Sequence, residues 1–137
     1  MINLQKLKLT AGIAMLAGGM NLAYADVVVV VSAKSSTTTM TADEISQIYL
    51  GKSKAMKPVE TSGSPIRSQF YSKVAGKDEA QVKAIWSKLV FTGKATAPKE
   101  LPSSAEVVKA VAADPNAIGY IDKSAVDSTV KVVYTVP

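Results

Sequence analysis

The stretch Ser62–Phe70 combines residue types that can bind a small anion. It reads Ser-Gly-Ser-Pro-Ile-Arg-Ser-Gln-Phe. Proline is favoured at the first helical position, so a helix is predicted to begin at Pro65 with Ser64 as its N-cap. Arg67 then puts a cation in the first turn, where it opposes the helix macrodipole by about 0.3–1 kcal/mol. An anion bound by the free N–H groups, the Ser64 hydroxyl and the guanidinium would reverse that sign. The alternative is that Arg67 faces water or pairs with a nearby carboxylate.

A second group of hydroxyls follows the first predicted strand, at Ser35, Ser36 and Thr37. These side chains are candidates to add hydrogen bonds to the same anion from the opposite rim of the site. The alternative is that this polar segment is a solvated loop. Both interpretations stay open at the level of sequence.

The composition excludes most catalytic chemistry. The chain contains no His and no Cys. It therefore has no Ser-His-Asp triad, no thiol nucleophile and no zinc site with imidazole or thiolate ligands. The 11 acidic residues are scattered, and most fall at predicted helix starts, where capping explains them. We expect a non-enzyme without a metal or a cofactor.

The N-terminus has the pattern of a signal peptide. Lys6 and Lys8 precede the apolar run Leu9–Ala17, and Ala-Tyr-Ala at 23–25 fits a small-x-small cleavage site. The apolar run is too short and too rich in glycine to span a bilayer. We expect residues 1–25 to be removed, which leaves one domain over 26–137 in the bacterial periplasm with no stable membrane anchor.

The charge balance is modestly basic. The chain has 16 Lys and Arg against 11 Asp and Glu, and loss of Lys6 and Lys8 lowers the formal net charge from +5 to +3. A small positive surplus suits an anionic ligand. No run of basic residues interleaved with aromatics points to nucleic acid. The densest basic cluster indicates either a solvated loop or a polyanion site, and it consists of Lys52, Lys54 and Lys57.

Hydrophobic patterning predicts an α/β domain with a small mixed sheet flanked by helices. The five consecutive valines Val27–Val31 are typical of a strand covered on both faces. Capping boxes begin helices at Thr41 and Ser103, and Asp78 is predicted to be the N-cap of a third helix with Gln81 at its third position. Lys94–Pro102 is expected to be a connector. The predicted strands are 26–31, 58–61, 118–121 and 130–136, and the predicted helices are 41–51, 65–76, 78–93 and 103–114.

Three stretches resemble one family. Ile45–Lys52 contains Tyr-Leu-Gly-Lys, Gly63–Phe70 contains the Gly-Ser-Pro-Ile-Arg turn, and Asn116–Ile121 reads Asn-Ala-Ile-Gly-Tyr-Ile. In this order they resemble elements of the phosphate-binding proteins of bacterial ABC transporters, over nearly all of the predicted mature chain. The chain has about half the length of those proteins. The resemblance thus implies one lobe of a type II periplasmic binding protein.

The resemblance implies a ligand site at Ser62, Gly63, Ser64, Ile66 and Arg67 for phosphate or a similar small oxyanion. Relative to the family turn, proline replaces a glycine and isoleucine replaces a threonine, which removes one N–H and one hydroxyl. A single lobe cannot close over a ligand by hinge motion, so weak affinity is expected. The implied partners are an ABC permease or a second protein chain. The alternative function is an interaction or assembly module that uses the same lobe as a protein-binding scaffold.

Overall fold

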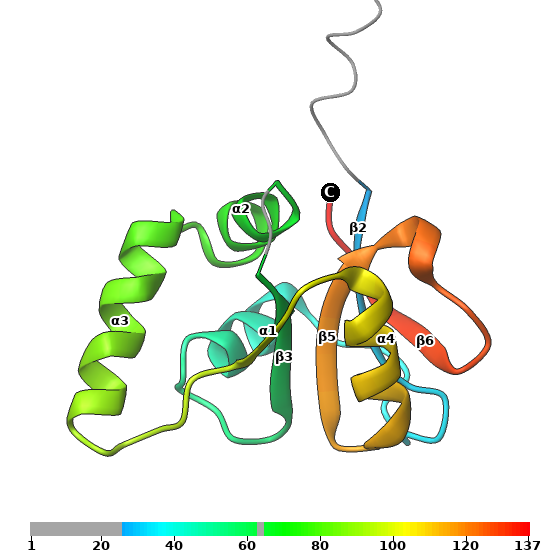
Figure 1. Ribbon diagram of the computed structural model, residues 1–137, viewed down its shortest axis with the longest axis horizontal. Helices are drawn as coiled ribbons and strands as arrows, with labels where there is room; N and C mark the ends of the chain where they lie inside the picture. The colour runs from blue at the N-terminus through cyan, green and yellow to red at the C-terminus, as the bar shows by residue number, and fades with distance from the viewer. Residues whose placement is uncertain (1–25, 63–64) are drawn as a thin grey trace, which may run out of the picture.

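The computed structural model describes residues 26–62 and 65–137. The predicted signal peptide and two of the predicted ligand residues, Gly63 and Ser64, lie outside the described part. The chain forms an α/β fold around a five-stranded mixed sheet with strand order β4-β3-β5-β2-β6 (Figure 1). The strands are β2 (Val27–Ser32), β3 (Lys57–Thr61), β4 (Lys99–Leu101), β5 (Ala117–Asp122) and β6 (Val130–Thr135). The helical segments are α1 (Ala42–Tyr49), α2 (Ile66–Phe70), the π-helical turn η3 (Tyr71–Ala75), α3 (Glu79–Phe91), α4 (Ser104–Ala113) and the 3₁₀ turn η4 (Lys123–Ala125).

The valine-rich strand β2 lies inside the sheet and has both faces covered, as its sequence predicts. It runs antiparallel to β5 on one side and to β6 on the other, whereas β3 runs parallel to β4 and β5. All six residues of β2 are buried. Because side chains alternate along a strand, Val27, Val29 and Val31 join the core beneath one set of helices. Val28 and Val30 join the core on the other face.

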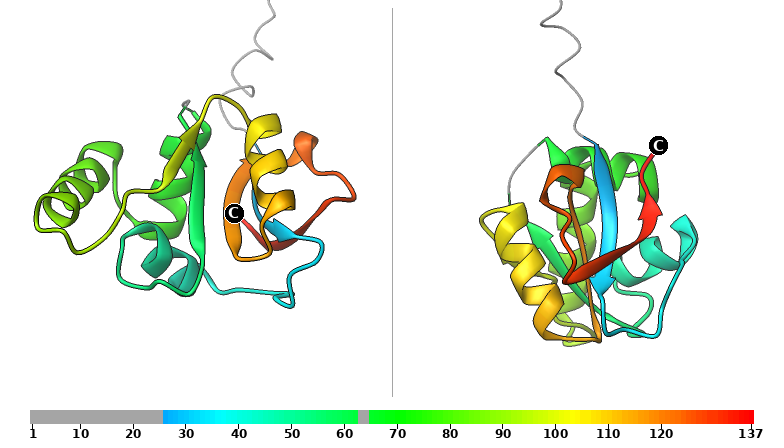
Figure 2. Two further views of the ribbon diagram at one scale, coloured as in Figure 1. Left: turned by 60° about the horizontal axis from the view of Figure 1, so that its bottom comes forward. Right: turned by 90° about the vertical axis from the view of Figure 1, so that its right-hand side faces the viewer.

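Helices cover the two faces unequally (Figure 2). Helix α4 packs alone on one face, through Val107, Val108 and Val111. Helices α1 and α2 and the η3 turn cover the other face. Helix α3 lies at the side of this second layer, beyond the β4–β3 edge of the sheet. Each face of the sheet is therefore covered by helices, and α3 packs against this assembly with only part of its surface.

The capping signals identify the helix starts correctly. Thr41 and Glu44 form a reciprocal capping box at α1, and Asp78 and Gln81 form another at α3. Ser103 accepts a hydrogen bond from the Glu106 N–H at the start of α4. These side chains supply acceptors for N–H groups that have no partner inside the helix.

Three predicted elements need correction. Residues 99–101, expected within a connector, form strand β4. Backbone pairing with β3, for example of Val59 with Lys99, defines this strand. Its own side chains are mostly exposed and show no alternation of buried and exposed residues. The second helix begins at Ile66, with Pro65 at its N-cap position, one residue later than predicted. Its second half is a π-helical turn, not α-helix, and this wider turn buries both Phe70 and Tyr71.

The apolar residues of α3 are only partly buried. Val82 and Trp86 are buried, but Val90 is 51% exposed and Phe91, which follows it, is 91% exposed. The helix lies beside the sheet instead of on it (Figure 1). Ile85 and Leu89 still pack against the core, and Val90 and Phe91 at the C-terminal end of the helix are left exposed. The periodicity identifies the helix but not the extent to which its face is covered.

Gly119 permits the close packing of α4 on β5. A Cβ atom at this position would lie 2.6 Å from Val107 Cγ1 and 3.0 Å from Val111 Cγ2, both on the buried face of α4. We expect Gly119→Ala to lower the free energy of unfolding by about 1–3 kcal/mol, since overpacking forces backbone and rotamer shifts. Urea unfolding measures this change. A loss below about 0.5 kcal/mol would mean that α4 moves away from the sheet freely.

Candidate functional site

The candidate ligand turn lies at the carboxyl ends of the parallel strands. Strand β3 pairs with β5 through Val59 and Gly119. Its last residue, Thr61, is followed by Ser62, and the described chain resumes at Pro65 directly before α2. In open α/β sheets, ligands bind at this end of the strands. The position of the turn therefore agrees with a ligand site, whatever its side chains contribute.

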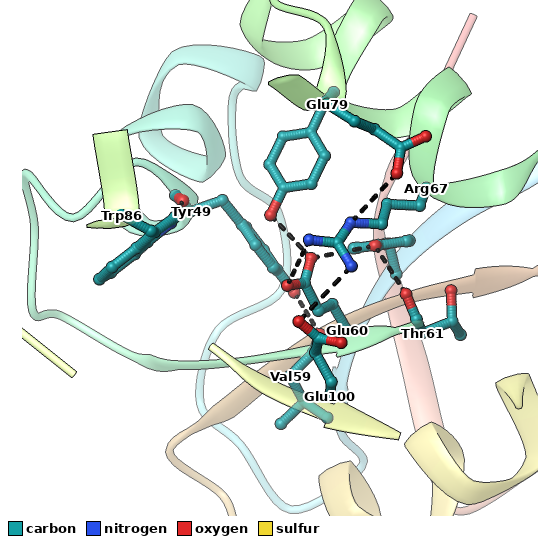
Figure 3. A network of polar contacts seen from close by, with 10 residues as sticks. Tyr49, Val59, Glu60, Thr61, Arg67, Glu79, Trp86 and Glu100 are labelled. Atoms are coloured by element: carbon teal, nitrogen blue, oxygen red, sulfur yellow. Dashed lines mark hydrogen bonds and ion pairs between the residues drawn. The ribbon is translucent and has the colours of Figure 1, made fainter. Parts of the chain in front are cut away.

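The Arg67 guanidinium lies among three carboxylates (Figure 3). Its Nη2 is 3.5 Å from Glu60 Oε2, its Nη1 is 3.5 Å from Glu100 Oε2, and its Nε is 3.6 Å from Glu79 Oε1. The Arg67 side chain is 18% exposed, compared with 37% for Glu79 and 53% for Glu100. Carboxylate pairing, the alternative left open by the sequence, is therefore what the structure shows. We call these four residues the Arg67 cluster.

Glu60 is the fixed member of the Arg67 cluster. Its side chain is 3% exposed. Its Oε1 accepts hydrogen bonds from the Tyr71 hydroxyl at 2.7 Å and from the Tyr120 hydroxyl at 3.1 Å. These two bonds and the nearby guanidinium provide the partners that a buried carboxylate requires. Glu100 is more than half exposed, whereas Glu79 also accepts a hydrogen bond from the Ser68 hydroxyl and is held more firmly than Glu100.

Burial and charge shift the pKa values of this cluster in opposite directions. Burial raises the pKa of Glu60 above its usual range, although the Tyr71 hydrogen bond and Arg67 partly counteract that effect. Burial would lower the pKa of Arg67, but the facing carboxylate of Glu60 raises it on balance. Burial likewise raises the pKa of Tyr71 and Tyr120 well above the usual value for tyrosine. Both phenols consequently stay protonated and act as hydrogen-bond donors.

Four buried aromatic rings pack together next to these polar groups, and we call them the aromatic cluster. Phe70 stacks on Tyr120 with ring centroids 4.1 Å apart and an interplanar angle of 8°. Tyr49 and Tyr71 meet both rings edge to face. The Tyr49 hydroxyl donates to the carbonyl oxygens of Val59 and Ile118, at 2.8 and 3.1 Å. The cluster fixes the positions of the phenols that face Glu60, and Tyr49 is fully buried within it.

Two buried polar atoms at this end of the sheet have no hydrogen-bond partner among the described residues. They are Thr61 Oγ1 and Arg67 Nε. The 3.6 Å ion pair of Nε to Glu79 is too long for a hydrogen bond. A buried donor or acceptor without a partner costs about 1–3 kcal/mol. The turn therefore has hydrogen-bonding capacity that the described side chains leave unused.

The predicted ligand residues are only partly brought together. Ser62 and Ile66 flank Arg67 at this end of the sheet, but the Ser62 N–H already donates to the Leu101 carbonyl at 2.9 Å. Gly63 and Ser64 fall outside the described residues, as noted above.

The structure does not bring the second predicted hydroxyl group to this site. Pairing of Val31 with Ile118 and of Val27 with Asp122 shows that β2 ends where β5 begins. Because Ser35, Ser36 and Thr37 follow β2, they lie at the opposite end of the sheet from the turn, roughly 15 Å away at about 3.3 Å per residue. Ser35 is buried there, and its hydroxyl accepts a hydrogen bond from the Thr37 N–H. The strand reversal that separates the two groups was not visible in the sequence.

Sequence reasoning missed the acidic members of the Arg67 cluster. Glu60 ends up on a strand, Glu79 at the start of α3 and Glu100 on β4, so no local spacing connects them. One signal was available: Glu60 lies inside a short predicted strand, next to Val59. A charged residue at such a position is rarely buried without a partner.

The described residues contain no group of three or more acidic side chains placed to hold a metal ion, and no helix long and apolar enough to cross a membrane. The Arg67 guanidinium occupies the centre of the acidic cluster and neutralises part of its charge.

Comparisons with known proteins identify the fold. No family model and no curated protein matches the sequence. A protein from Clostridium perfringens, named as a phosphate ABC transporter substrate-binding protein and solved with bound phosphate, aligns with a TM-score of 0.63 at 24% identity. An ABC-type phosphate transport receptor from Vibrio cholerae aligns with a TM-score of 0.62 at 20% identity. These alignments cover 81% and 82% of this chain but only 45% and 46% of the neighbours.

The fold is thus that of a periplasmic binding protein, and the chain spans less than half the length of the neighbours it matches. This confirms the resemblance to a single lobe that the three sequence stretches indicate. At these identities the likeness defines the solute-binding fold and leaves the ligand to be argued from the site itself.

Proposed function

We propose that this chain is an exported, single-lobed solute-binding protein that takes a small oxyanion, in the first place phosphate, at the turn 62–67. The observation that carries this proposal is the unused donor of Arg67, whose buried Nε has no hydrogen-bond acceptor among the described residues. A phosphate oxygen is a suitable acceptor for a guanidinium N–H. The proposal also draws support from the Clostridium perfringens neighbour, which was solved with bound phosphate.

In this proposal the anion competes with the protein's own carboxylates. Glu100 is 53% exposed and rotates away, Glu79 must also give up its hydrogen bond from the Ser68 hydroxyl, and Glu60 stays with its two tyrosines. Because Glu60 repels an anion when ionised and its pKa is raised, binding strengthens as the pH falls and Glu60 becomes protonated. With one lobe and a competing acid, we expect a dissociation constant of about 1 mM. The protein partner in this proposal is an ABC permease.

Thermal melting in phosphate tests the proposal. At 10 mM phosphate, a dissociation constant of about 1 mM stabilises the protein by about 1.4 kcal/mol, which raises Tm by roughly 5 °C. The double variant Glu79→Gln/Glu100→Gln removes two competing carboxylates, and we expect it to bind about tenfold more tightly. Chloride at matched ionic strength provides the reference.

The matched control is Asp43→Asn/Asp127→Asn, which changes the net charge equally at exposed positions away from the turn. Asp127 lies in the loop before β6, next to Thr129, whose carbonyl oxygen accepts a hydrogen bond from the Ala33 N–H at the opposite end of the sheet. We expect this control to melt in phosphate as the wild type does. Equal shifts in phosphate and chloride for all three proteins would refute oxyanion binding.

A further inference from the structure

A separate groove lies at the amino ends of the parallel strands, opposite the Arg67 cluster. It has a volume of about 1190 Å³ and runs between α3, the loop from α1 to β3, and the ends of α4 and β5. This volume exceeds the 300–1,000 Å³ of a typical small-molecule pocket. The groove walls are mostly apolar, and their larger side chains are Ile48, Met56, Trp86 and Val90.

The C-terminal end of α3 carries two exposed apolar side chains, one of which lines the groove. Val90 lines the groove and is 51% exposed, and Phe91 beside it is 91% exposed. Single exposed apolar side chains are common, but a contiguous apolar patch is typical of an interaction surface. Val90 therefore belongs to the apolar wall of the groove, whereas Phe91 follows it in sequence and lies outside the groove lining.

The groove also carries positive charge. Lys54, Lys57, Lys94 and Lys99 line the groove, and Asp114 is the acid among its lining residues. Asp114 pairs with Lys57 at 3.3 Å. The described part of the chain records no ion pair for the other three lysines. The groove lining therefore combines mostly apolar side chains with a net positive charge.

We infer that this groove docks an acidic amphipathic helix of a partner protein. An apolar helix face fills such a groove through residues spaced i, i+3, i+4 and i+7, and acidic residues on its flanks meet the lysines. A second copy of this chain is a poor occupant, because residues 26–137 carry a formal net charge of +3 and like charges repel. A flat lipid surface would leave the hollow between α3 and the sheet unfilled. The inference is independent of oxyanion binding at the other end of the sheet.

The single tryptophan of the chain provides the readout. Trp86 forms part of the groove wall, and its Nε1 donates to the Tyr49 carbonyl at 2.8 Å. The probe is a 14-residue amphipathic peptide with leucines on one face and glutamates on the other, compared with the same peptide carrying lysines in place of the glutamates. We expect the acidic peptide alone to change Trp86 emission, with affinity falling at least fivefold between about 50 mM and 500 mM salt.

Charge reversal at the lysines of the groove tests the assignment. We expect Lys54→Glu/Lys94→Glu to weaken binding of the acidic peptide at least tenfold. The control Lys73→Glu/Lys123→Glu changes the net charge equally at exposed sites outside the groove lining and should leave binding unchanged. Circular dichroism checks that each variant is folded.

Three results would overturn the inference. They are equal affinity for the acidic and the basic peptide, an unchanged affinity in Lys54→Glu/Lys94→Glu, and displacement of the acidic peptide by vesicles of anionic phospholipid. The last result would assign the surface to a membrane instead.

Discussion

Replacing Arg67 with methionine is expected to lower the free energy of unfolding by about 3 kcal/mol. Methionine preserves much of the side-chain volume but leaves Glu60, which is 3% exposed, without its cation. Removal of one partner from a buried ion pair costs about 3–5 kcal/mol, because the remaining charge stays desolvated. Glu79 and Glu100 are exposed enough to be hydrated and add little to this loss. Chemical denaturation at neutral pH measures the change.

The double variant Arg67→Met/Glu60→Gln separates charge from packing. Glutamine is neutral, and its carbonyl oxygen still accepts the hydrogen bonds from Tyr71 and Tyr120. We expect it to recover most of the lost stability, to within about 1.5 kcal/mol of the wild type. If the double variant is as unstable as Arg67→Met alone, Arg67 stabilises the fold by packing and not by neutralising Glu60.

The pH dependence of the same variant provides an independent check. The pKa of Glu60 is raised in the folded state, so the folded protein holds this proton more strongly than the unfolded chain. Stability contributed by protonated Glu60 is present at low pH and is lost as the pH rises through the folded pKa. Loss of Arg67 raises that pKa further. The stability gap between wild type and Arg67→Met should therefore narrow as the pH falls towards 4.5, the ordinary value for glutamate.

The fold could be predicted largely from local signals. The valine run of β2, the capping signals at Thr41 and Asp78, and the Asn-Ala-Ile-Gly-Tyr-Ile stretch act within a few residues of chain, and the structure contains the elements that they predict. Strand β4 could not be found in this way, because its three residues are placed only by backbone pairing with β3. The π-helical turn was also hidden, since burial of adjacent aromatics breaks a four-residue period.

The candidate site was harder to predict because its parts come from distant segments. The sequence identified Arg67 and its turn, but the carboxylates around it belong to β3, α3 and β4. Strand β2 is antiparallel to β5, so the hydroxyl groups that follow β2 lie at the end of the sheet opposite to Arg67. Sequence patterns report which face of an element is buried, whereas a site depends on strand order and direction.

The carboxylates around Arg67, which the sequence did not predict, change the electrostatics of the proposed site. A lone Arg67 at a helix start would attract an anion with its full charge, but three carboxylates give the Arg67 cluster a formal charge of −2 when all are ionised. The Arg67 cluster has first of all a structural role, because Arg67 pairs with the buried Glu60 and Glu60 accepts hydrogen bonds from two tyrosines of the aromatic cluster. Any oxyanion bound here must displace the exposed acids, so affinity and structural role are in competition at Arg67.

Phe70→Ala is expected to be the most destabilising single truncation, at about 3–5 kcal/mol. Phe70 is fully buried, stacks on Tyr120 and contacts the rings of Tyr49 and Tyr71. Truncation opens a cavity beneath the phenols that donate to Glu60, so lost packing adds to a loosened polar network. Urea unfolding measures the loss.

The chain offers a matched control, because it has only two phenylalanines. Phe91 is 91% exposed, so Phe91→Ala should change stability by no more than about 0.5 kcal/mol. Near-ultraviolet circular dichroism of Phe70→Ala should also lose the tyrosine signal, because the stacked geometry of Tyr120 depends on Phe70. Equal stability of the two variants would mean that the aromatic cluster does not hold the α2–η3 segment on the sheet, and that Glu60 is positioned by other contacts.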